Sequence, residues 1–343
     1  AKSHRYHCIS CGAEMIPKLG NLREHHFAHK AACSCNSETY LHKLGKILLK
    51  KKWDESPEFY IRYMQRVKCG KYKDCVFYKD NVCEDSMLSE KYKNFAQMVV
   101  YQIYPRSFND SNGDGIGDIR GIIEKLRYLK ELGINAIWIC PCYKSPNDDN
   151  GYDISDYYDI MDEFGTLDDI KELISEAHSY EIKIIMDLVP NHTSTQHKWF
   201  IESKKSKNNE YSDYYYWFDE PVNDWGSVFG GSAWEYCKER NQYYLHSYAV
   251  SQADLNWDNP KVVKEIQKVV DYWTNLGVDG FRCDVIDQIS KDFKNGNNCF
   301  GPNLHKYIND LFGRPETERL FTVGECWARD IDCLLYTSDA ADE

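Results

Sequence analysis

The chain has 343 residues, a net charge of −12 and a hydrophobic content of 42%. An aromatic fraction of 14% excludes a disordered chain, and the length allows one large domain or two to three smaller ones. No stretch reaches the roughly 20 apolar residues of a membrane-spanning helix, and no signal peptide is visible, so we expect no membrane partner and a cytoplasmic location.

Charge divides the chain into two pieces. Residues 1–93 carry 18 Lys and Arg against 11 Asp and Glu, whereas residues 94–343 carry 24 against 43. The cysteines differ in the same way, because those of the first piece are clustered and those of the second are scattered among apolar neighbours. This asymmetry predicts a small basic domain over 1–93 and an acidic domain that follows it.

The basic piece begins with a Cys-x-x-Cys pair, which is followed by a histidine-rich segment and two more cysteines. Two thiolates at this spacing bind one Zn²⁺, and a histidine and a cysteine further on would complete a tetrahedral site. The predicted ligands are Cys8, Cys11, His29 and Cys33. His26 and Cys35 are alternatives for the second half of the site, and a redox pair or ordinary surface residues are the alternative without a metal.

The residues Cys8, Cys11 and 26–29 (His-Phe-Ala-His) resemble the start of competence proteins of the CoiA type. That resemblance implies a small Cys/His-rich zinc-binding-like module. It also makes nucleic acid a conceivable partner, for the basic piece only. A zinc-dependent, nucleic-acid-associated module with a passenger barrel fragment is therefore one alternative function.

Short apolar strands and amphipathic helices alternate from residue 95 onward. We expect strands at 99–104, 136–139, 182–188, 280–284 and 320–325, and helices at 119–132, 167–179, 262–276 and 303–312. Repeated strand-helix units in this order are typical of a parallel α/β fold.

Three successive strands of this piece end on ionisable residues, which a packed core does not require. These are Asp187, Arg282 with Asp284, and Glu325. In a (β/α)8 barrel such strand ends converge on the active site, although a single carboxylate there is as often a helix cap. Arg282 and Asp284 share a strand face, so the Arg282 charge should keep Asp284 ionised as a nucleophile, and Glu325 is the natural acid/base of glycoside cleavage.

Six motifs of the acidic piece span about 230 residues, at 96–108, 145–157, 187–192, 252–256, 280–284 and 323–327. They resemble glycoside hydrolase family 13, the α-amylase superfamily, in its oligo-1,6-glucosidase and α-glucosidase branch. The resemblance implies Asp284 as nucleophile and Glu325 as acid/base, with the terminal glucose bound by Asp149, Tyr152, His192 and Arg282. It also implies an inserted domain after the third strand, over about 191–256.

Val285 bears on the bond that is cleaved. In the family that the chain resembles, Val after the nucleophile accompanies α-1,6 linkages and Ala accompanies α-1,4 linkages. Val285 therefore favours a retaining α-glucosidase acting on isomaltose-type oligosaccharides, with an α-linked gluco-oligosaccharide as the partner molecule. A trehalose-6-phosphate hydrolase and an α-1,4-glucosidase of the same family are alternatives, and Val285 could also be only a β-branched strand residue.

A loop of alternating oxygen-bearing residues precedes the first helix of the acidic piece. It consists of Asp110, Asn112, Asp114, Ile116 (through its carbonyl) and Asp118. This spacing matches the first nine residues of an EF-hand loop, but Gly121 occupies the place of the twelfth-position Glu. The pattern and the family resemblance predict a structural Ca²⁺.

A complete barrel of the family has eight strands, and only five are expected here. We therefore predict an incomplete (β/α)8 TIM barrel over 94–332 that is inactive as given, because open sheet edges destabilise it. Residues 333–343 resemble a translated sequencing adapter, with a natural polar tail as the alternative. The junction near 90–94 is consistent with a fusion of two unrelated reading frames, and the oligomeric state cannot be predicted.

Overall fold

The computed structural model describes residues 6–7, 14–18, 26–29 and 98–326. The chain divides into two units, Ala1–Cys83 and Glu84–Glu343, which are described separately. In the first unit, three strands form an antiparallel sheet in the order β1-β2-β3: β1 (Tyr6–His7), β2 (Glu14–Lys18) and β3 (His26–His29).

The predicted zinc ligands of the first unit lie mostly outside the described residues. Cys8, Cys11 and Cys33 fall outside them, and so does the predicted adapter-like tail at 333–343. His29 ends β3, where its backbone pairs with Met15 of β2. The zinc site and the origin of the tail therefore stay predictions.

The second unit is built on a five-stranded parallel sheet in the order β15-β14-β8-β5-β4. Its strands are β4 (Val100–Ile103), β5 (Ala136–Ile139), β8 (Lys183–Leu188), β14 (Gly280–Cys283) and β15 (Phe321–Gly324). Strands that are consecutive in this series are neighbours in the sheet, and every pair is parallel. The predicted parallel α/β architecture is confirmed, as the sheet of a partial barrel.

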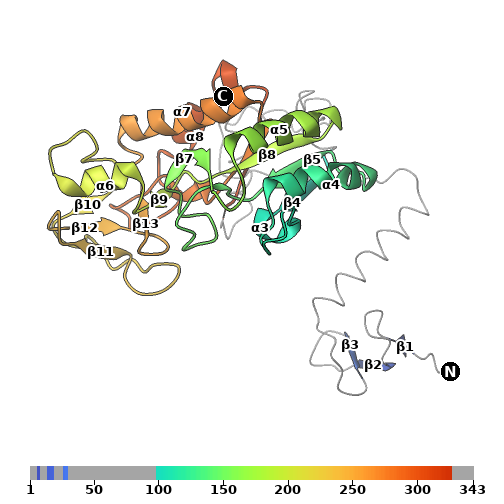
Figure 1. Ribbon diagram of the computed structural model, residues 1–343. Helices are drawn as coiled ribbons and strands as arrows, with labels where there is room; N and C mark the ends of the chain where they lie inside the picture. The colour runs from blue at the N-terminus through green and yellow to red at the C-terminus, as the bar shows by residue number, and fades with distance from the viewer. Residues whose placement is uncertain (1–5, 8–13, 19–25, 30–97, 327–343) are drawn as a thin grey trace, which may run out of the picture. The chain divides into compact units, whose positions relative to one another are not determined.

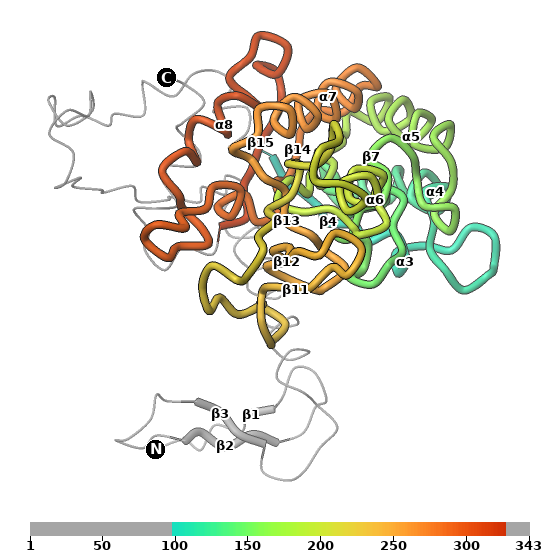
Figure 2. Tube along the Cα trace, turned by 90° about the vertical axis from the view of Figure 1, so that its left-hand side faces the viewer, coloured from blue at the N-terminus to red at the C-terminus, as the bar shows by residue number. Residues whose placement is uncertain are grey.

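Four amphipathic helices cover the sheet: α4 (Ile119–Glu131), α5 (Leu167–Ser179), α7 (Pro260–Leu276) and α8 (Leu304–Phe312). Figure 1 shows α4, α5 and α7 along one side of the sheet, and in Figure 2 α8, α7, α5 and α4 follow one another around its outside. Each helix turns a stripe of apolar residues at helical spacing toward one continuous core. Burial of these stripes stabilises the helices and holds the sheet in shape.

The ends of these helices are set by capping residues. The Asp118 side chain accepts a hydrogen bond from the backbone of Gly121 at the start of α4, and Thr166 forms a capping box with Asp169 at the start of α5. Helix α7 ends at Gly277, whose φ of 106° is in the left-handed region that glycine adopts without strain.

One glycine is required for the close contact between β14 and β15. A Cβ on Gly280 would lie 2.1 Å from the carbonyl oxygen of Phe321, its partner in the parallel ladder. Only a residue without a side chain allows this approach. Gly280 therefore fixes how the two strands that carry Arg282 and Glu325 lie against each other.

A long excursion leaves the sheet after β8 and returns before α7. It begins with β9 (His192–Ser194) and ends with β13 (Gln252–Asp254), which pair antiparallel so that His192 faces Asp254. Between them lie α6 (Lys198–Lys205), β10 (Trp217–Phe218), β11 (Trp234–Cys237) and β12 (Gln242–Leu245). The last three strands form a small antiparallel sheet with an aromatic core of its own.

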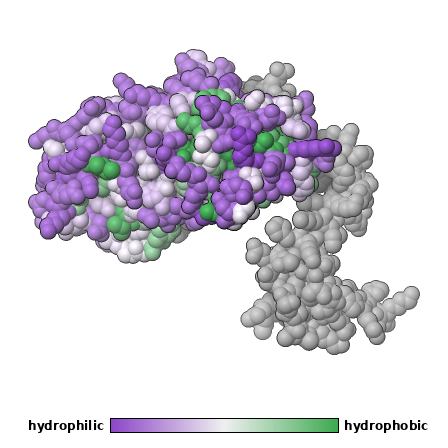
Figure 3. All heavy atoms as spheres, in the orientation of Figure 1, coloured by the Kyte–Doolittle hydropathy of each residue, from purple (hydrophilic) through white to green (hydrophobic). Residues whose placement is uncertain are grey.

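The remaining short elements lie near the strand ends. They are α3 (Pro105–Phe108), β6 (Tyr143–Lys144), β7 (Asp156–Ile160), and the 3-10 helices at Ile286–Gln288 and Pro315–Thr317. The face drawn in Figure 3 is mostly hydrophilic, with apolar residues in small separate groups. Within the described ranges, no helix combines the length and apolar character needed to cross a bilayer.

Candidate active site

The guanidinium of Arg282 on β14 gathers three carboxylates at the C-terminal ends of neighbouring strands. Its Nη1 donates to Asp284 Oδ1 at 2.7 Å and to Asp187 Oδ1 at 2.9 Å, and its Nη2 donates to Glu325 Oε2. Register explains the convergence, because Arg282 pairs with Asp187 of β8 and with Val323 of β15 in the parallel ladders. The structure thus brings Asp284, Glu325 and Arg282 together as predicted.

Burial dominates the electrostatics of this carboxylate cluster, which we define as Asp187, Asp284 and Glu325. The side chains of Asp187 and Asp284 are 0% and 9% exposed, whereas that of Glu325 is 33% exposed. Desolvation raises the pKa of Asp187 to about 6, against the opposing charge of Arg282. One guanidinium faces three carboxylates, so the cluster favours binding a proton.

The expectation that Arg282 keeps Asp284 ionised names only one of the effects on the pKa of Asp284. Arg282 lowers the pKa of Asp284, but desolvation and the neighbouring Asp187 carboxylate outweigh it, and the pKa lies well above its ordinary value. Glu325, which hydrogen-bonds to Asp284, raises it further. The expectation considered the Arg282–Asp284 pair alone and left out burial and the two neighbouring carboxylates.

Asp187 is a site residue that sequence reasoning placed at a strand end without assigning it a role. Its Oδ2 accepts hydrogen bonds from Trp138 Nε1 at 3.0 Å and from the Tyr152 hydroxyl at 3.2 Å. The Arg282 guanidinium also lies over the Trp138 ring, 5.0 Å from its centroid. Asp187 therefore connects the guanidinium to the side chains of Trp138 and Tyr152.

The predicted sugar-binding residues form a second, adjoining group. His192 Nε2 lies 3.2 Å from the backbone oxygen of Tyr152, and Asp149 Oδ2 accepts from Gln252 Nε2 at 2.9 Å. Gln252 enters the group because β13 pairs with β9, so residues far apart in the chain meet. Gln252 was part of a motif but had no predicted role, and only the strand pairing reveals its place.

Val285 does not lie in a strand. Its backbone angles, φ 37° and ψ 46°, are left-handed, and it precedes the 3-10 helix Ile286–Gln288 with its side chain buried. This conformation is rare for a β-branched residue and stores strain. The interpretation of Val285 as an ordinary strand residue is therefore wrong, and the turn directs its backbone N–H toward Glu325 Oε2, 3.4 Å away.

The predicted calcium loop folds as a series of turns closed by its own side chains. Asp110 accepts backbone hydrogen bonds from Asn112, Gly113 and Gly115, and the bonds from Gly115 and Gly113 lower its pKa, so it is ionised. Asp118 is buried and caps α4. Across residues 98–326 and the short described strands before them, no three His, Cys, Asp or Glu side chains form a metal-binding group.

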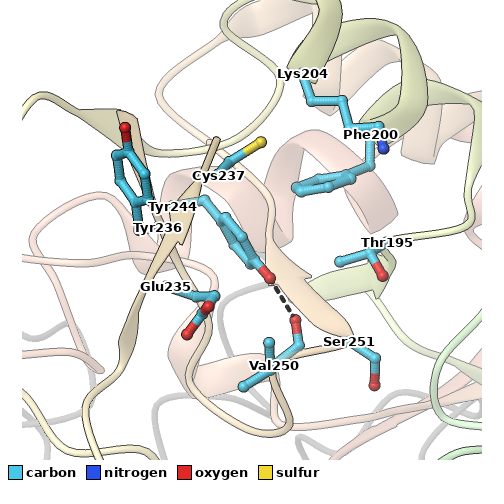
Figure 4. A pocket seen from close by; sticks show the side chains of 9 residues that line it. All are labelled: Thr195, Phe200, Lys204, Glu235, Tyr236, Cys237, Tyr244, Val250 and Ser251. Carbon is cyan, nitrogen blue, oxygen red and sulfur yellow. Dashed lines mark hydrogen bonds between the residues drawn. The ribbon is translucent and has the colours of Figure 1, made fainter. Parts of the chain in front are cut away.

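A pocket of about 490 Å³ opens in the excursion, away from the carboxylate cluster. Figure 4 shows its lining residues: Thr195, Phe200, Lys204, Glu235, Tyr236, Cys237, Tyr244, Val250 and Ser251. The Tyr244 hydroxyl donates to the backbone oxygen of Val250 at 2.8 Å and closes one side. No strand-end carboxylate lines this pocket, so we do not place the chemistry there.

Parallel strands whose C-terminal ends carry carboxylates bridged by an arginine fit the arrangement expected at the active site of a glycoside hydrolase with a barrel fold. Residues 102–343 match the family described as "Alpha amylase, catalytic domain", and the chain belongs to that family. The resemblance seen in the motifs is thereby confirmed. Residues 1–38 match the N-terminal domain of the competence protein CoiA.

Two curated proteins illustrate the sequence similarity. An oligo-1,6-glucosidase of Parageobacillus thermoglucosidasius is 55% identical over 250 residues, which are 67% of this chain and 44% of the relative. A trehalose-6-phosphate hydrolase of Bacillus subtilis (strain 168) is 46% identical over 273 residues, 74% of this chain and 48% of the relative. The chain spans about half the length of the curated relatives it matches.

Solved structures agree with this assignment. The crystal structure of Bacillus licheniformis trehalose-6-phosphate hydrolase superposes with a TM-score of 0.67 at 49% identity. The match covers 71% of this chain and 47% of the solved chain. At this identity the likeness is one of sequence as well as of fold.

Proposed function

We propose that the second unit carries the active site of a retaining α-glucosidase that removes terminal α-1,6-linked glucose from oligosaccharides. The observation that carries the proposal is the bridge from Arg282 to both Asp284 and Glu325. One guanidinium can hold both carboxylates only if they lie close together. This is the arrangement of a retaining pair, since an inverting pair stands further apart to admit a water.

In the proposed reaction, Asp284 attacks the anomeric carbon of the terminal glucose while Glu325 protonates the departing glycosidic oxygen. The glycosidic bond breaks and a covalent bond from glucose to Asp284 forms. Glu325, now ionised, takes a proton from water, and the resulting hydroxide releases glucose and restores Asp284. This step requires an ionised Asp284 and a proton on Glu325, while the Arg282 guanidinium offsets the charges of Asp187 and Asp284.

The preference for α-1,6 linkages rests on Val285 and on the oligo-1,6-glucosidases among the relatives. The likeness to trehalose-6-phosphate hydrolases supplies the competing candidate. An α-1,4-glucosidase is the third. These candidates share the catalytic groups and differ in the linkage that is cleaved or in the phosphate of the second glucose, so a comparison of substrates separates them.

The test measures glucose release from isomaltose, maltose and trehalose 6-phosphate. Because the chain spans 44% of the Parageobacillus relative, it is assayed both alone and joined to the remaining segment of that relative. We expect kcat/KM to be highest for isomaltose, and Asp284→Asn and Glu325→Gln to abolish release. A higher kcat/KM for maltose or trehalose 6-phosphate would overturn the linkage assignment, and full activity of Asp284→Asn would overturn the mechanism.

We also propose that the loop of Asp110, Asn112, Asp114, the Ile116 carbonyl and Asp118 binds Ca²⁺. Its support is the donor chemistry, because carboxylate, amide and carbonyl oxygens suit a hard cation. The ionised Asp110 and the exposed Asp114 fit that donor set. Bound Ca²⁺ would stabilise the loop before α4 and take no part in sugar chemistry.

For the first unit we propose a zinc site formed by Cys8, Cys11, His29 and Cys33. The likeness of residues 1–38 to the CoiA N-terminal domain supports it. Zinc content of the whole chain is the test. We expect one Zn²⁺ that is lost in Cys8→Ser and kept in Cys237→Ser, and equal zinc content in both variants would refute the site.

We include a cytoplasmic location in the proposal. Its support is that four cysteines of the described residues, Cys140, Cys142, Cys237 and Cys283, form no disulfide bond. Cysteines outside disulfides are typical of a reducing compartment.

A further inference from the structure

Lys291 is a buried cation that the proposed reaction does not use. Its side chain is 1% exposed and lies in the segment that follows Val285 and the 3-10 helix Ile286–Gln288. The ammonium donates to Asp254 Oδ2 at 2.7 Å, to Asn191 Oδ1 at 3.1 Å and to the backbone oxygen of Gln288 at 2.9 Å. All three acceptors are fixed, so the ammonium is held in one position.

The contact with Lys291 decides how the Asn191 amide is oriented. An ammonium only donates, so the amide atom that faces it must be the oxygen. The amide nitrogen of Asn191 then faces His192 Nδ1, 3.2 Å away. Because an amide NH₂ group also only donates, Nδ1 must accept and therefore carries no proton.

The other side of the His192 ring offers the place for the proton. Nε2 lies 3.2 Å from the Tyr152 backbone oxygen, which accepts only, and 3.2 Å from the Nε2 of Gln252, whose NH₂ group also donates to Asp149. Nδ1 faces the Asn191 donor, so of the two contacted ring nitrogens it is Nε2 that has an acceptor beside it. The proton of a neutral His192 thus belongs on Nε2, on the edge that faces Tyr152 and Gln252.

We propose that Lys291 is a positioning residue, which acts through the Asn191 amide to fix His192 in its Nε2–H tautomer. The role of His192 in sugar binding rests on the proposed function; the tautomer does not. In this tautomer the ring directs its one proton toward the Tyr152 backbone oxygen, 3.2 Å away.

The surroundings of His192 also favour a neutral ring. Desolvation lowers the pKa of His192, and the Lys291 charge lowers it further, whereas Asp254 and Asp149 oppose both. The Tyr248 ring covers the imidazole, with ring centroids 5.3 Å apart. A neutral ring with one defined proton is the state that the surroundings favour.

The experiment reads the tautomer directly, by nitrogen NMR of the whole chain labelled with ¹⁵N-histidine, at a pH above 7. His192→Gln identifies the His192 signals. We expect a protonated Nε2 and a bare Nδ1 in the unaltered chain. In Lys291→Met, the Asn191 amide is free to rotate, and the signals should shift toward a mixture of tautomers.

A second variant keeps the test valid if Lys291→Met does not fold. Asn191→Asp keeps an acceptor for Lys291 but replaces the NH₂ group by an oxygen, so we expect the proton to move to Nδ1. Asp254→Asn is the matched control, because it weakens the ion pair of Lys291 and leaves the contact between Lys291 and Asn191 in place. It should keep the original tautomer.

The possible outcomes distinguish failure of the Lys291 proposal from failure of the proposed glucosidase function. A protonated Nδ1 in the unaltered chain, or an unchanged tautomer in Asn191→Asp, would overturn the proposal. The same change in Asp254→Asn as in Lys291→Met would also overturn it, since general loosening would then explain both. Failure of isomaltose hydrolysis with the expected tautomers would instead refute the glucosidase function and leave the role of Lys291 intact.

Discussion

Arg282 and Asp284 are joined by a 2.7 Å hydrogen bond from Nη1 to Oδ1, on the same face of one strand. The same guanidinium also binds Asp187 and Glu325, so it is the counter-charge of the whole cluster. Removing a partner from a buried charge leaves that charge uncompensated, which is more harmful than losing a surface ion pair.

Arg282→Met should therefore destabilise the protein strongly. We expect the free energy of unfolding, measured by urea titration at neutral pH, to fall by about 3–5 kcal/mol. Arg127→Met removes an exposed ion pair with Glu131 and should change it by about 0.5 kcal/mol or less. Equal effects of the two substitutions would show that the cluster is not effectively buried.

Asp187 predicts a pH dependence of stability. Its pKa in the folded protein is about 6, above the ordinary 3.8, so the folded state holds the proton more tightly. That contribution to stability is present below about pH 4 and is lost as pH rises through about 6, a difference of about 3 kcal/mol. Asp187→Asn is neutral at every pH and does not undergo this loss. As pH rises from about 4 to about 7, the free energy of unfolding of the variant minus that of the parent should therefore rise by up to about 3 kcal/mol.

The measurement compares urea unfolding of parent and variant from about pH 4 to about pH 7. Other carboxylates common to both proteins largely cancel in the difference. The exposed Asp162→Asn serves as control and should show a flat difference. A flat difference for Asp187→Asn as well would contradict a raised pKa at this carboxyl.

Because the backbone of Val285 is left-handed, glycine should be less destabilising than alanine at this position, the reverse of their order in a helix. Glycine loses one buried carbon more than alanine, but it adopts φ 37° without strain, whereas the Cβ of alanine clashes in this conformation. We expect Val285→Gly to be more stable than Val285→Ala by about 1 kcal/mol in thermal or urea unfolding.

Val263, buried in helix α7, provides the control for that comparison. In a helix, Val263→Gly should be less stable than Val263→Ala by about 1 kcal/mol. The same order at both positions would mean that residue 285 is not held in the left-handed conformation.

The proposed calcium loop predicts a stability that depends on added metal. Ca²⁺ should raise the midpoint of thermal unfolding of the chain, and chelator should reverse the change, because a ligand that binds the folded state stabilises it. Asp114→Asn should weaken this response, while Asp162→Asn, an exposed aspartate outside the loop, should keep it. A response identical in both variants would place the cation elsewhere.

The sequence predicted the five strands of the parallel sheet and the four helices that cover it almost to their ends, because their periodicity and caps are local; the short strands and helix of the excursion were not predicted. The helix over 167–179 is found unchanged, since Thr166 and Asp169 define its start from neighbouring residues. The link between Arg282 and Asp284 was also predictable, because residues two apart on a strand share a face.

The contacts that surround the predicted site residues could not be predicted from local sequence patterns. Lys291 meets Asn191 across 100 residues, and Gln252 meets Asp149 across 103. Such contacts depend on strand pairing and on the path of the excursion, and no local pattern encodes them. The conformation of Val285 escaped for the opposite reason, since its local preference for a strand is overridden by the turn that follows Asp284.

The pairing of β9 with β13 determines where the excursion leaves and returns. It starts and finishes side by side, and three residue pairs, His192 with Asp254 among them, join its two ends. Trp199, Phe200 and Tyr244 of the excursion also pack into the same core as the sheet. The position of His192 therefore depends on the packing of the excursion as well as on the parallel sheet.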